Sequence, residues 1–327
     1  MKALITGAPG WLGTRLVENL LKDGLDIKCI IHPSMSDERL KKYNVETVKA
    51  DITNPESLKN VCKDISIVFH CAAVLKPKNK NEFYEVNTLG TKYLLEEAIN
   101  SEVSKFLYIS SGSAGAGYSS LNIVKEADPP RPYMDYGLSK LKAEKILNDY
   151  HNNKKINVVI IRPGWLYGID GPERQVKFLK AIKKGKTLVF GNGNVLRSLC
   201  NIENCVNGIM IAYKSEKALG QTYFIGDLKA YKLNDAYKDI AELLDIEYKP
   251  CYIPIPAYNT TPYDLVDRAM QGVRFYNPEL HIFWDWAKNI VCSIEKAQHE
   301  LNYKPPYNLK EGMKLAIEEY RKKGIEI

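Results

Sequence analysis

The chain opens with a short apolar run, Lys2–Thr6, and then reads Gly7-Ala8-Pro9-Gly10-Trp11-Leu12-Gly13 before an amphipathic stretch at Thr14–Lys22. In this order of strand, turn and helix, Gly7 permits a tight turn and Gly10 lets the backbone approach a pyrophosphate, while Gly13 allows close packing of helix on strand. The amino terminus of the helix offers free N–H groups and the positive end of its dipole to phosphates. We therefore predict a dinucleotide-binding turn that is formed by Gly7, Pro9, Gly10, Trp11, Leu12 and Gly13.

The first half of the chain alternates β-branched runs with helical patterns. Gly24 is placed to end the first helix, and another helix is expected at Phe83–Asn100. This alternation predicts an α/β fold with a Rossmann-type doubly wound parallel sheet, in which ligands bind at the carboxyl ends of the strands. The predicted strands are Lys2–Thr6, Ile27–Ile31, Glu46–Lys49, Ile65–His70, Lys105–Ser110 and Val158–Arg162.

The alternation loosens after about Gly168, where glycines, prolines and short mixed elements take over. We therefore expect a dinucleotide-binding domain over residues 1–168. A small, mainly substrate-binding carboxyl-terminal lobe would follow over 169–327, with some segments returning to the sheet. Residues 252–286 are rich in prolines and aromatics and fit an irregular part of that lobe, and the chain closes with a helical pattern at Leu309–Lys322.

Composition narrows the classes of function. The 327 residues carry a net charge of +7, but the lysines are spread along helical patterns, so no nucleic-acid partner is expected. Seven scattered cysteines without a Cys-x-x-Cys pair predict no metal site. No apolar run is long enough to span a bilayer, and the chain begins directly in a strand pattern that leaves no room for a leader. We expect a cytoplasmic protein with no integral membrane segment.

A second motif, Tyr136-Gly137-Leu138-Ser139-Lys140, heads a helical stretch. Tyr136 and Lys140 are four residues apart and share one face of that helix. A tyrosine hydroxyl titrates near pH 10, about three units above neutrality, and a nearby ammonium lowers its pKa. The spacing therefore predicts an acid/base pair for proton exchange.

A third motif follows the strand that ends at residue 110, where the chain reads Ser110-Ser111-Gly112-Ser113. The carboxyl end of a central parallel strand faces the ligand site of such a sheet. A hydroxyl at this point can hydrogen-bond a substrate oxygen and hold it against the tyrosine.

Taken in this order, the three motifs resemble the extended short-chain dehydrogenase/reductase superfamily, of the NAD-dependent epimerase/dehydratase type. Further similarities extend along nearly the whole chain, at Asp51-Ile52, His70-Cys71-Ala72-Ala73, Val86–Thr91, Arg162–Gly168 and Ser293–Pro305. The resemblance implies an NAD(P)-dependent dehydrogenase, reductase or epimerase.

The resemblance also implies roles for individual residues. Tyr136 would be the acid/base, and Lys140 would bind the nicotinamide ribose and lower the pKa of the tyrosine. Ser111 would hold the substrate oxygen, with Ser113 as the second choice, and Asn87 would complete a proton relay through water. Besides the glycine turn, Tyr136 and Lys140, the implied cofactor-binding residues are His32, Asp51, Ile52, Cys71, Ala72, Ala73 and Pro163.

Departures from the pattern bear on the substrate. Trp165 stands where many nucleotide-sugar enzymes of the superfamily have an asparagine that contacts the diphosphate, and an indole replaces an amide poorly there. Gly112 and Ser113 stand where dehydratases carry an acid pair. The Arg-Pro-x-x-x-Tyr-Gly pattern at 162–168 resembles the branch of 3β-hydroxysteroid dehydrogenases and dihydroflavonol reductases.

These departures favour hydride transfer between nicotinamide and a secondary alcohol or ketone. The alternative is a nucleotide-sugar epimerase that retains its NAD, because Arg197 could bind a diphosphate. A non-catalytic nucleotide-sensing module is also conceivable, but the complete Tyr/Lys/Ser set argues against it.

The end of the second strand bears on the choice of dinucleotide. An acidic residue there would bind both ribose hydroxyls and repel a 2′-phosphate, but this chain has His32-Pro33-Ser34. His32 and Ser34 can donate hydrogen bonds to phosphate oxygens, so the sequence favours NADP over NAD. The resemblance also implies a homodimer that is formed through two long helices, including Phe83–Asn100 and Ser139–Tyr150.

Overall fold

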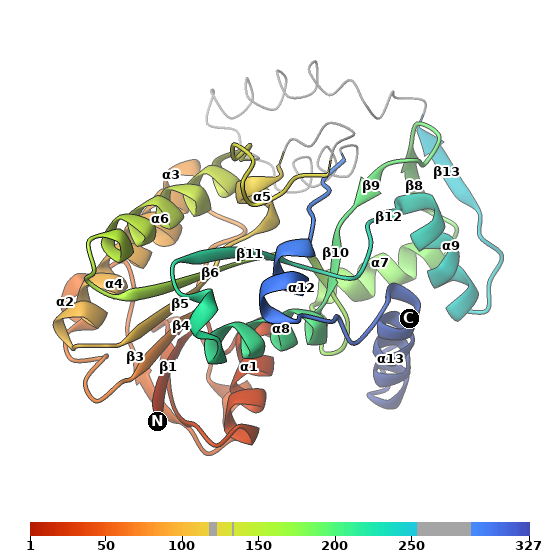
Figure 1. Cartoon of the computed structure of the whole chain (residues 1–327). Helices are drawn as coiled ribbons and strands as arrows, with labels where there is room; N and C mark the ends of the chain where they lie inside the picture. The colour runs from red at the N-terminus through yellow and green to blue at the C-terminus, as the bar shows by residue number, and fades with distance from the viewer. Residues whose placement is uncertain (118–122, 133, 254–288) are drawn as a thin grey trace.

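The computed structural model describes residues 1–117, 123–132, 134–253 and 289–327. A seven-stranded parallel sheet lies at its centre, in the order β11-β6-β5-β4-β1-β2-β3 (Figure 1). The order changes direction beside β1, and the carboxyl ends of the strands at such a switch point form the ligand site of this fold. The strands are β1 Lys2–Thr6, β2 Asp26–Ile31, β3 Glu46–Lys49, β4 Ile67–His70, β5 Lys105–Ile109, β6 Asn157–Pro163 and β11 Gln221–Ile225.

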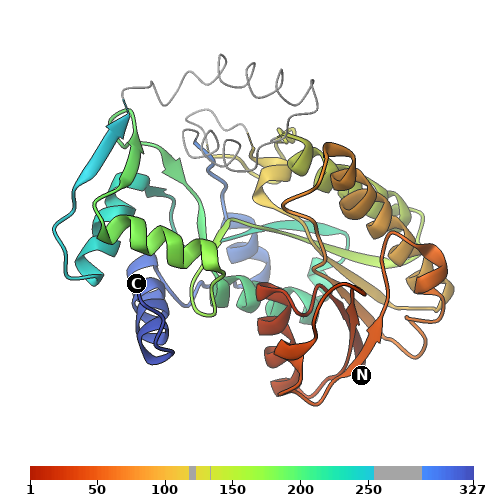
Figure 2. The same ribbon diagram turned by 180° about the vertical axis from the view of Figure 1, so that it is seen from behind.

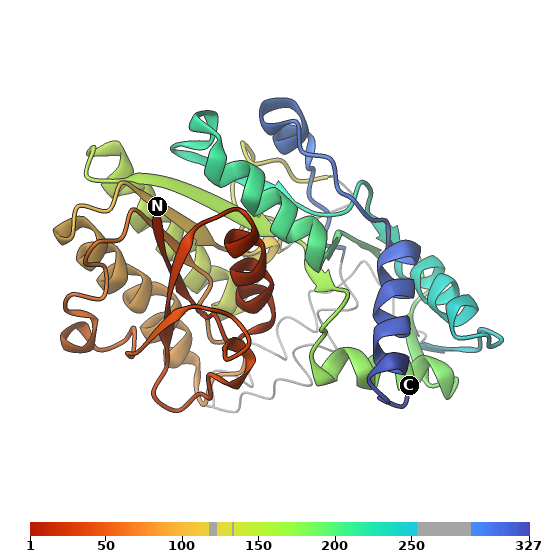
Figure 3. The same cartoon turned by 90° about the horizontal axis from the view of Figure 1, so that it is seen from below.

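Helices cover both faces of this sheet, as expected for a doubly wound fold. On one face α1 (Trp11–Lys22) and α8 (Ile202–Lys214) lie side by side (Figure 3). On the other face lie α2 (Pro55–Leu58), α4 (Thr91–Asn100) and α6 (Met134–Asn152). The predicted α/β fold with a doubly wound parallel sheet is confirmed.

Side-chain alternation in the strands explains the two layers. On β1, Ile5 packs in the cluster under α1 and α8, whereas the neighbouring Leu4 packs in the cluster under α4 and α6. Both side chains are fully buried, because successive residues of a strand point to opposite faces and both faces here are covered.

The carboxyl-terminal part has a core of its own, in which α7 (Glu173–Lys183), α9 (Leu233–Leu243) and α13 (Leu309–Lys322) pack together (Figures 1 and 2). The last of these helices has the bounds that the sequence predicts. Three short strand pairs accompany them: β7 (Trp165–Tyr167) with β10 (Leu199–Asn201), β9 (Leu196–Arg197) with β12 (Tyr231–Lys232), and β8 (Thr187–Phe190) with β13 (Pro250–Ile253). Between these elements, β11 returns to the edge of the large sheet.

The helix predicted at Phe83–Asn100 differs from expectation. It consists of α3 (Lys80–Tyr84), a π-helical segment η2 (Glu85–Gly90) and α4. A π-turn holds one extra residue and commonly occurs at functional sites. The remaining short elements are η1 (Glu38–Leu40), α5 (Gly112–Gly115), η3 (Glu216–Ala218) and α12 (Glu295–Leu301).

Most of the aromatic-rich segment 252–286 lies outside the described residues. The seven cysteines are free thiols. Within the described ranges no group of His, Cys, Asp and Glu side chains is arranged to hold a metal ion. No helix in those ranges is long and apolar enough to cross a membrane.

Candidate active site

The glycine turn between β1 and α1 leaves no room for side chains. A Cβ on Gly7 would lie 2.8 Å from the Ala72 nitrogen, and one on Gly13 would lie 2.3 Å from the Gly7 carbonyl oxygen. Gly10 stands at the amino end of α1 and has no side chain to cap the first N–H groups, which stay available to a phosphate. This cradle fits the pyrophosphate of a dinucleotide. Pro9 is buried, and the half-buried Trp11 donates from Nε1 to the Ile169 carbonyl at 2.7 Å.

A buried hydrogen-bond network lies directly beneath this turn. His70 Nδ1 lies 2.6 Å from Thr6 Oγ1, and His70 Nε2 lies 2.9 Å from Thr91 Oγ1. The Thr91 hydroxyl donates to the Asn87 carbonyl, so it accepts from Nε2, and Thr6 donates to Nδ1. Burial and the Lys140 charge lower the pKa of His70 to about 3, which keeps the ring neutral.

The other predicted cofactor residues also lie at strand ends. Ala72, between Cys71 and Ala73 after β4, donates its N–H to Thr6 Oγ1 at 3.1 Å. After β2, His32 Nδ1 lies 2.7 Å from Ser34 Oγ, and its Nε2 lies 3.6 Å from a carboxylate oxygen of Asp51. Ile52 is buried, and a Cβ on Gly90 would lie 2.9 Å from its side chain. Pro163 ends β6, and its carbonyl faces Gly112.

The predicted catalytic hydroxyls meet at the end of β5. The Ser111 side chain lies close enough to Tyr136 to lower the pKa of its hydroxyl. Ser111 Oγ also accepts from the Ser113 N–H at 3.1 Å and so begins α5. A Cβ on Gly137 would lie 2.5 Å from the Ser113 carbonyl, so a glycine after Tyr136 lets α6 approach this turn closely.

Lys140 points into the protein beneath these hydroxyls. Its Nζ donates to the Ile109 carbonyl at 2.7 Å and lies 4.3 Å from the centre of the Tyr108 ring. The residue is 1% exposed, and burial lowers the pKa of its ammonium to about 7, against the opposing effect of Glu144. Lys140 is therefore a buried group that can exchange a proton near neutral pH.

The proton affinity of Tyr136 differs from the sequence-based expectation. Burial raises the pKa of the hydroxyl, and the hydrogen bond from Ser111 and the charge of Arg174 lower it only in part. The expected lowering by Lys140 is wrong for this structure, because the ammonium is held at the Ile109 carbonyl. The half-buried ring instead packs on Phe83, with centroids 5.8 Å apart.

Asn87 lies in the π-helical segment and is fully buried. Its Oδ1 accepts from the Val74 N–H at 2.9 Å, and its Nδ2 donates to Ser139 Oγ at 3.1 Å. Asn87 therefore reaches α6 through Ser139, which lies between Tyr136 and Lys140 in the sequence.

Two predicted substrate residues lie together on the carboxyl-terminal side. Trp165 is on β7 and Arg197 on β9, and the Arg197 guanidinium carbon lies 5.9 Å from the centre of the indole ring. Arg197 is 4% exposed. The Arg197 side chain is therefore packed against the tryptophan, and little of it reaches the surface.

Sequence reasoning assigned no role to three charged residues near this site. Arg174, in the first turn of α7, acts electrostatically on Tyr136, and its position after Gly171-Pro172 at a helix start is a usable signal. Glu144 and Arg162 form a buried ion pair of 2.6 Å behind the catalytic residues. Glu144 continues the spacing of Tyr136 and Lys140 by one further turn of α6.

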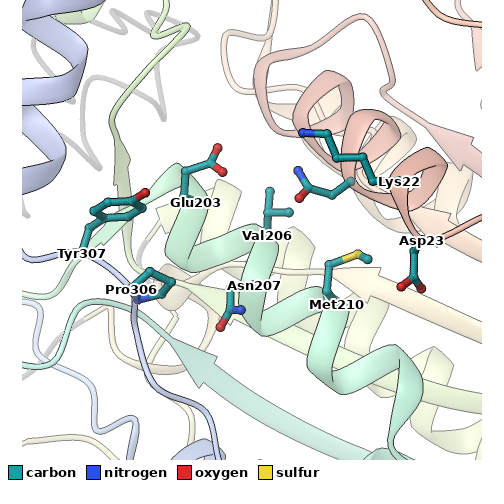
Figure 4. Close-up of a pocket in the computed structure, with 9 residues that line it drawn as sticks. Lys22, Asp23, Glu203, Val206, Asn207, Met210, Pro306 and Tyr307 are labelled. Carbon is teal, nitrogen blue, oxygen red and sulfur yellow. The ribbon is translucent and has the colours of Figure 1, made fainter.

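A surface depression of about 390 Å³ lies elsewhere on the molecule (Figure 4). It is formed by the carboxyl-terminal half of α1, by α8 and by the segment before α13, whereas the glycine cradle lies at the amino end of α1. None of the predicted site residues lines it; the lining residues are Asn19, Lys22, Asp23, Glu203, Val206, Asn207, Met210, Pro306 and Tyr307.

A doubly wound sheet with a glycine cradle at its switch point and a Tyr-x-x-x-Lys helix beside it defines an NAD(P)-binding enzyme of the extended short-chain dehydrogenase/reductase class. Residues 3–226 match the model of the NAD dependent epimerase/dehydratase family, and the chain belongs to that family. The superfamily and the enzyme class that the sequence predicts are thereby confirmed.

The relatives of this chain include both epimerases and dehydrogenases. The chain is 30% identical to a UDP-glucose 4-epimerase of Vibrio cholerae, over 95% of this chain and 93% of that protein. It is 28% identical to the decarboxylating sterol-4-alpha-carboxylate 3-dehydrogenase of Mus musculus, over 86% of this chain and 72% of that protein. The structure of UDP-glucuronic acid 4-epimerase from Bacillus cereus in complex with UDP-glucuronic acid and NAD has the same fold, with a TM-score of 0.77, 24% identity and coverage of 98% and 99%.

Proposed function

We propose that this protein transfers a hydride reversibly between the nicotinamide of NAD(P) and a secondary alcohol or ketone of a small molecule. The observation that carries the proposal is the grouping at the carboxyl end of β5, where the Ser111 side chain lowers the pKa of the Tyr136 hydroxyl and the Lys140 ammonium is held at the neighbouring Ile109 carbonyl. Two hydroxyls that converge there can both bind one substrate oxygen. When bound, the nicotinamide supplies or accepts the hydride.

Each residue of this group has a separate task in the proposal. Ser111 holds the substrate oxygen by a hydrogen bond, and Tyr136 gives a proton to that oxygen or takes one from it. Lys140, whose pKa is about 7, holds the nicotinamide ribose and returns protons to the tyrosine. Asn87 completes a proton relay through water and is held beside α6 by its hydrogen bond to Ser139, and Ser113 is a further donor on the same turn as Ser111.

The cofactor is held by the glycine cradle, and we propose that NADP is preferred. The support is the pair His32 and Ser34, which lie together after β2, where no acidic residue stands in the sequence. Asp51 lies beside His32, and its carboxylate would repel a 2′-phosphate, which opposes this preference. The ratio of the dissociation constants for NADPH and NADH tests this choice, and a lower constant for NADH contradicts it.

The substrate remains a secondary alcohol or ketone, with Trp165 beside it as an apolar surface. A second candidate is epimerisation of a nucleotide sugar with retained NAD. It is favoured by the identity of 30% to the Vibrio cholerae epimerase and by the arginine at position 197, which could bind a diphosphate.

The division into a dinucleotide-binding domain at 1–168 and a mainly substrate-binding lobe at 169–327 belongs to the same proposal. So do a homodimer and a cytoplasmic location, in which the seven cysteines stay reduced.

Purification separates the two candidates. The protein is isolated without added dinucleotide, denatured, and the released nucleotide is quantified. A dehydrogenase or reductase is expected to release little and to oxidise added NADPH or NADH when ketones are supplied. Stoichiometric NAD together with interconversion of UDP-sugars, without net change in nicotinamide absorbance, would instead establish the epimerase.

A further inference from the structure

Glu144 is a buried carboxylate that the proposed chemistry does not use directly. It lies on α6, one turn after Lys140 and two turns after Tyr136, and its side chain is 2% exposed. Arg162 binds both its oxygens, through Nε at 2.9 Å and Nη2 at 2.6 Å. The Ser110 hydroxyl donates to the same carboxylate.

These partners come from the two strands nearest to the catalytic residues. Ser110 lies between Ile109, whose carbonyl accepts from Lys140, and Ser111, whose side chain lowers the pKa of Tyr136. The Ser110 N–H donates to the Ile161 carbonyl at 2.7 Å, next to Arg162. One carboxylate therefore ties α6 to the carboxyl ends of both β5 and β6.

The arginine side of this contact is held in place as well. The Arg162 guanidinium carbon lies 5.3 Å from the centre of the Phe224 ring on β11. A Cβ on Gly115 would lie 2.6 Å from Arg162 Nη1, so α5 also packs against the guanidinium. Desolvation of a buried ion pair offsets much of its attraction, so such a pair adds little stability compared with apolar residues. Positioning explains its presence better than stability does.

The charge of Glu144 also acts on Lys140. It raises the pKa of the ammonium, against burial, and keeps more of it protonated at neutral pH. The charged and titratable groups around Lys140 are Glu144 on α6, His70 and Cys71 at the end of β4, Tyr108 on β5, Tyr136 on α6, and Arg162 on β6 through its pair with Glu144.

We propose that Glu144 is a positioning residue of this site. By binding Ser110 and Arg162, it fixes the position of α6 relative to the ends of β5 and β6. It thereby also fixes the distance of Tyr136 and Lys140 from Ser111. It acts through these residues and does not touch the substrate. The inference rests on the proposed function of Tyr136, Lys140 and Ser111.

The test uses Glu144→Gln, which keeps the shape and removes the charge. We expect kcat to fall about ten- to a hundredfold, since small misplacements at a reacting centre have effects of this size. The dissociation constant of the dinucleotide should stay within about threefold of wild type, because the glycine cradle is untouched. The alkaline limb of the pH profile of kcat should move to lower pH by about one unit, because Lys140 loses its neighbouring anion.

Two further variants separate positioning from general damage. Glu144→Asp keeps the charge, so the pH profile should return to that of wild type while kcat recovers only in part. Glu203→Gln removes the carboxylate of the Arg15–Glu203 ion pair between α1 and α8, with atoms 2.7 Å apart, and should leave kcat and the pH profile unchanged. If Glu144→Gln does not fold, Ser110→Ala removes the contact to β5 alone, and kcat is expected to fall by about tenfold.

A measurement without turnover keeps the two proposals apart. NMR titration of isotope-labelled lysines, with Lys140→Met for assignment, gives the pKa of Lys140 in wild type and in Glu144→Gln. A lower pKa in the variant supports the role of Glu144 even if no hydride transfer is detected, a result that would refute the proposed function alone. An unchanged Lys140 pKa together with wild-type kcat in Glu144→Gln, or wild-type kcat in Ser110→Ala, would overturn the inference.

Discussion

At the scale of single residues, burial and local partners decide the proton affinities of this site. Lys140 is fully buried and Tyr136 is half-buried, and burial disfavours the charged form of each: it lowers the pKa of the lysine to about 7 and raises that of the tyrosine. The pKa of the lysine therefore falls well below that of the tyrosine, and the tyrosine stays protonated at neutral pH. A tyrosine that stays protonated is suited to donate its proton to a ketone oxygen when the proposed reaction runs as a reduction.

The hydroxyl of Tyr136 can be removed alone by Tyr136→Phe. We expect kcat to fall by about 10² to 10⁴, because the proton-transferring group is lost, whereas the dinucleotide dissociation constant should change by less than about threefold. Tyr150→Phe is a matched control on the same helix, since it removes a hydroxyl that is bonded to Glu96 at 2.9 Å. Steady-state kinetics and a binding titration check both. Turnover of Tyr136→Phe within a few-fold of wild type would remove the acid/base role.

His70 predicts a pH dependence of stability. Its pKa falls from 6.5 to about 3 on folding, so below 6.5 the unfolded chain binds a proton that the folded chain does not. The stability is fully present above 6.5 and is lost as the pH falls toward 3, by about 1.4 kcal/mol per pH unit for one proton. Urea unfolding between about pH 7 and pH 4 should show a shallower decline for His70→Gln, by up to this slope.

The exposed His299 supplies the comparison for this measurement. His299→Gln removes an exposed imidazole and should leave the decline of the free energy of unfolding unchanged. Equal slopes for wild type and His70→Gln would show that the ring becomes protonated within the folded protein.

How far the site could be predicted depends on the distance between partners in the sequence. Tyr136 and Lys140 are four residues apart on a helix, and Ser111 follows a recognisable strand, so short patterns locate them. The Arg162 partner of Glu144 and the Thr6 and Thr91 partners of His70 come from other strands and helices. The position of the Lys140 ammonium at the Ile109 carbonyl is likewise set by packing, and the expected effect on Tyr136 fails for that reason.

Among the secondary-structure elements, the regular strands and helices could be predicted from their sequence patterns, whereas the π-helical interruption of a helix could not. The strands β1, β4, β5 and β6 are covered on both faces, so their β-branched and apolar runs stand out in the sequence. The π-helical segment Glu85–Gly90 carries no such mark, because its extra residue changes the hydrogen bonds and not the composition. Gly90 packs against Ile52 there, a contact between elements that are distant in the sequence.

The fit of α1 against β1 is testable with Gly13→Ala. The new Cβ would lie 2.3 Å from the Gly7 carbonyl oxygen and 2.8 Å from Ala8 Cα, both backbone atoms, so the helix must move. We expect a loss of about 1–3 kcal/mol in the free energy of unfolding. Dinucleotide affinity should weaken at least about tenfold, equivalent to about 1.4 kcal/mol. Thermal or urea unfolding and a binding titration measure the two effects.

Gly24→Ala is the control, because it lies beyond the other end of the same helix. Its φ is +79°, and no atom lies within 4 Å of an added Cβ, so only the left-handed backbone is strained. Stability should fall by about 1–2 kcal/mol while dinucleotide affinity is retained. Unchanged affinity in Gly13→Ala as well would show that the cradle does not bind the pyrophosphate.

At the scale of the whole molecule, the junction between the large sheet and the carboxyl-terminal part is built on one buried carboxylate. Asp227, after β11, accepts from the Tyr167 hydroxyl at 2.7 Å, the Asn201 N–H at 2.9 Å and Asn204 Nδ2 at 2.7 Å. Burial raises the pKa of this carboxyl to about 6. The contact joins β7, β10 and α8 to the edge of the sheet, and no local pattern in the sequence indicates it.

The proposed homodimer leads to a test at this same scale. Sedimentation at micromolar concentration should give about twice the chain mass of 37.1 kDa. Leu89 lies in η2 within the predicted interface helix and is 41% exposed, so a dimer would bury it. Leu89→Glu should therefore shift the protein to monomer, since an unpaired charge is costly at an apolar interface. Leu315→Glu is the control, because Leu315 is 38% exposed on α13, outside the predicted interface, and its variant should stay dimeric. A wild-type monomer, or an equal effect of both substitutions, would place no interface on these helices.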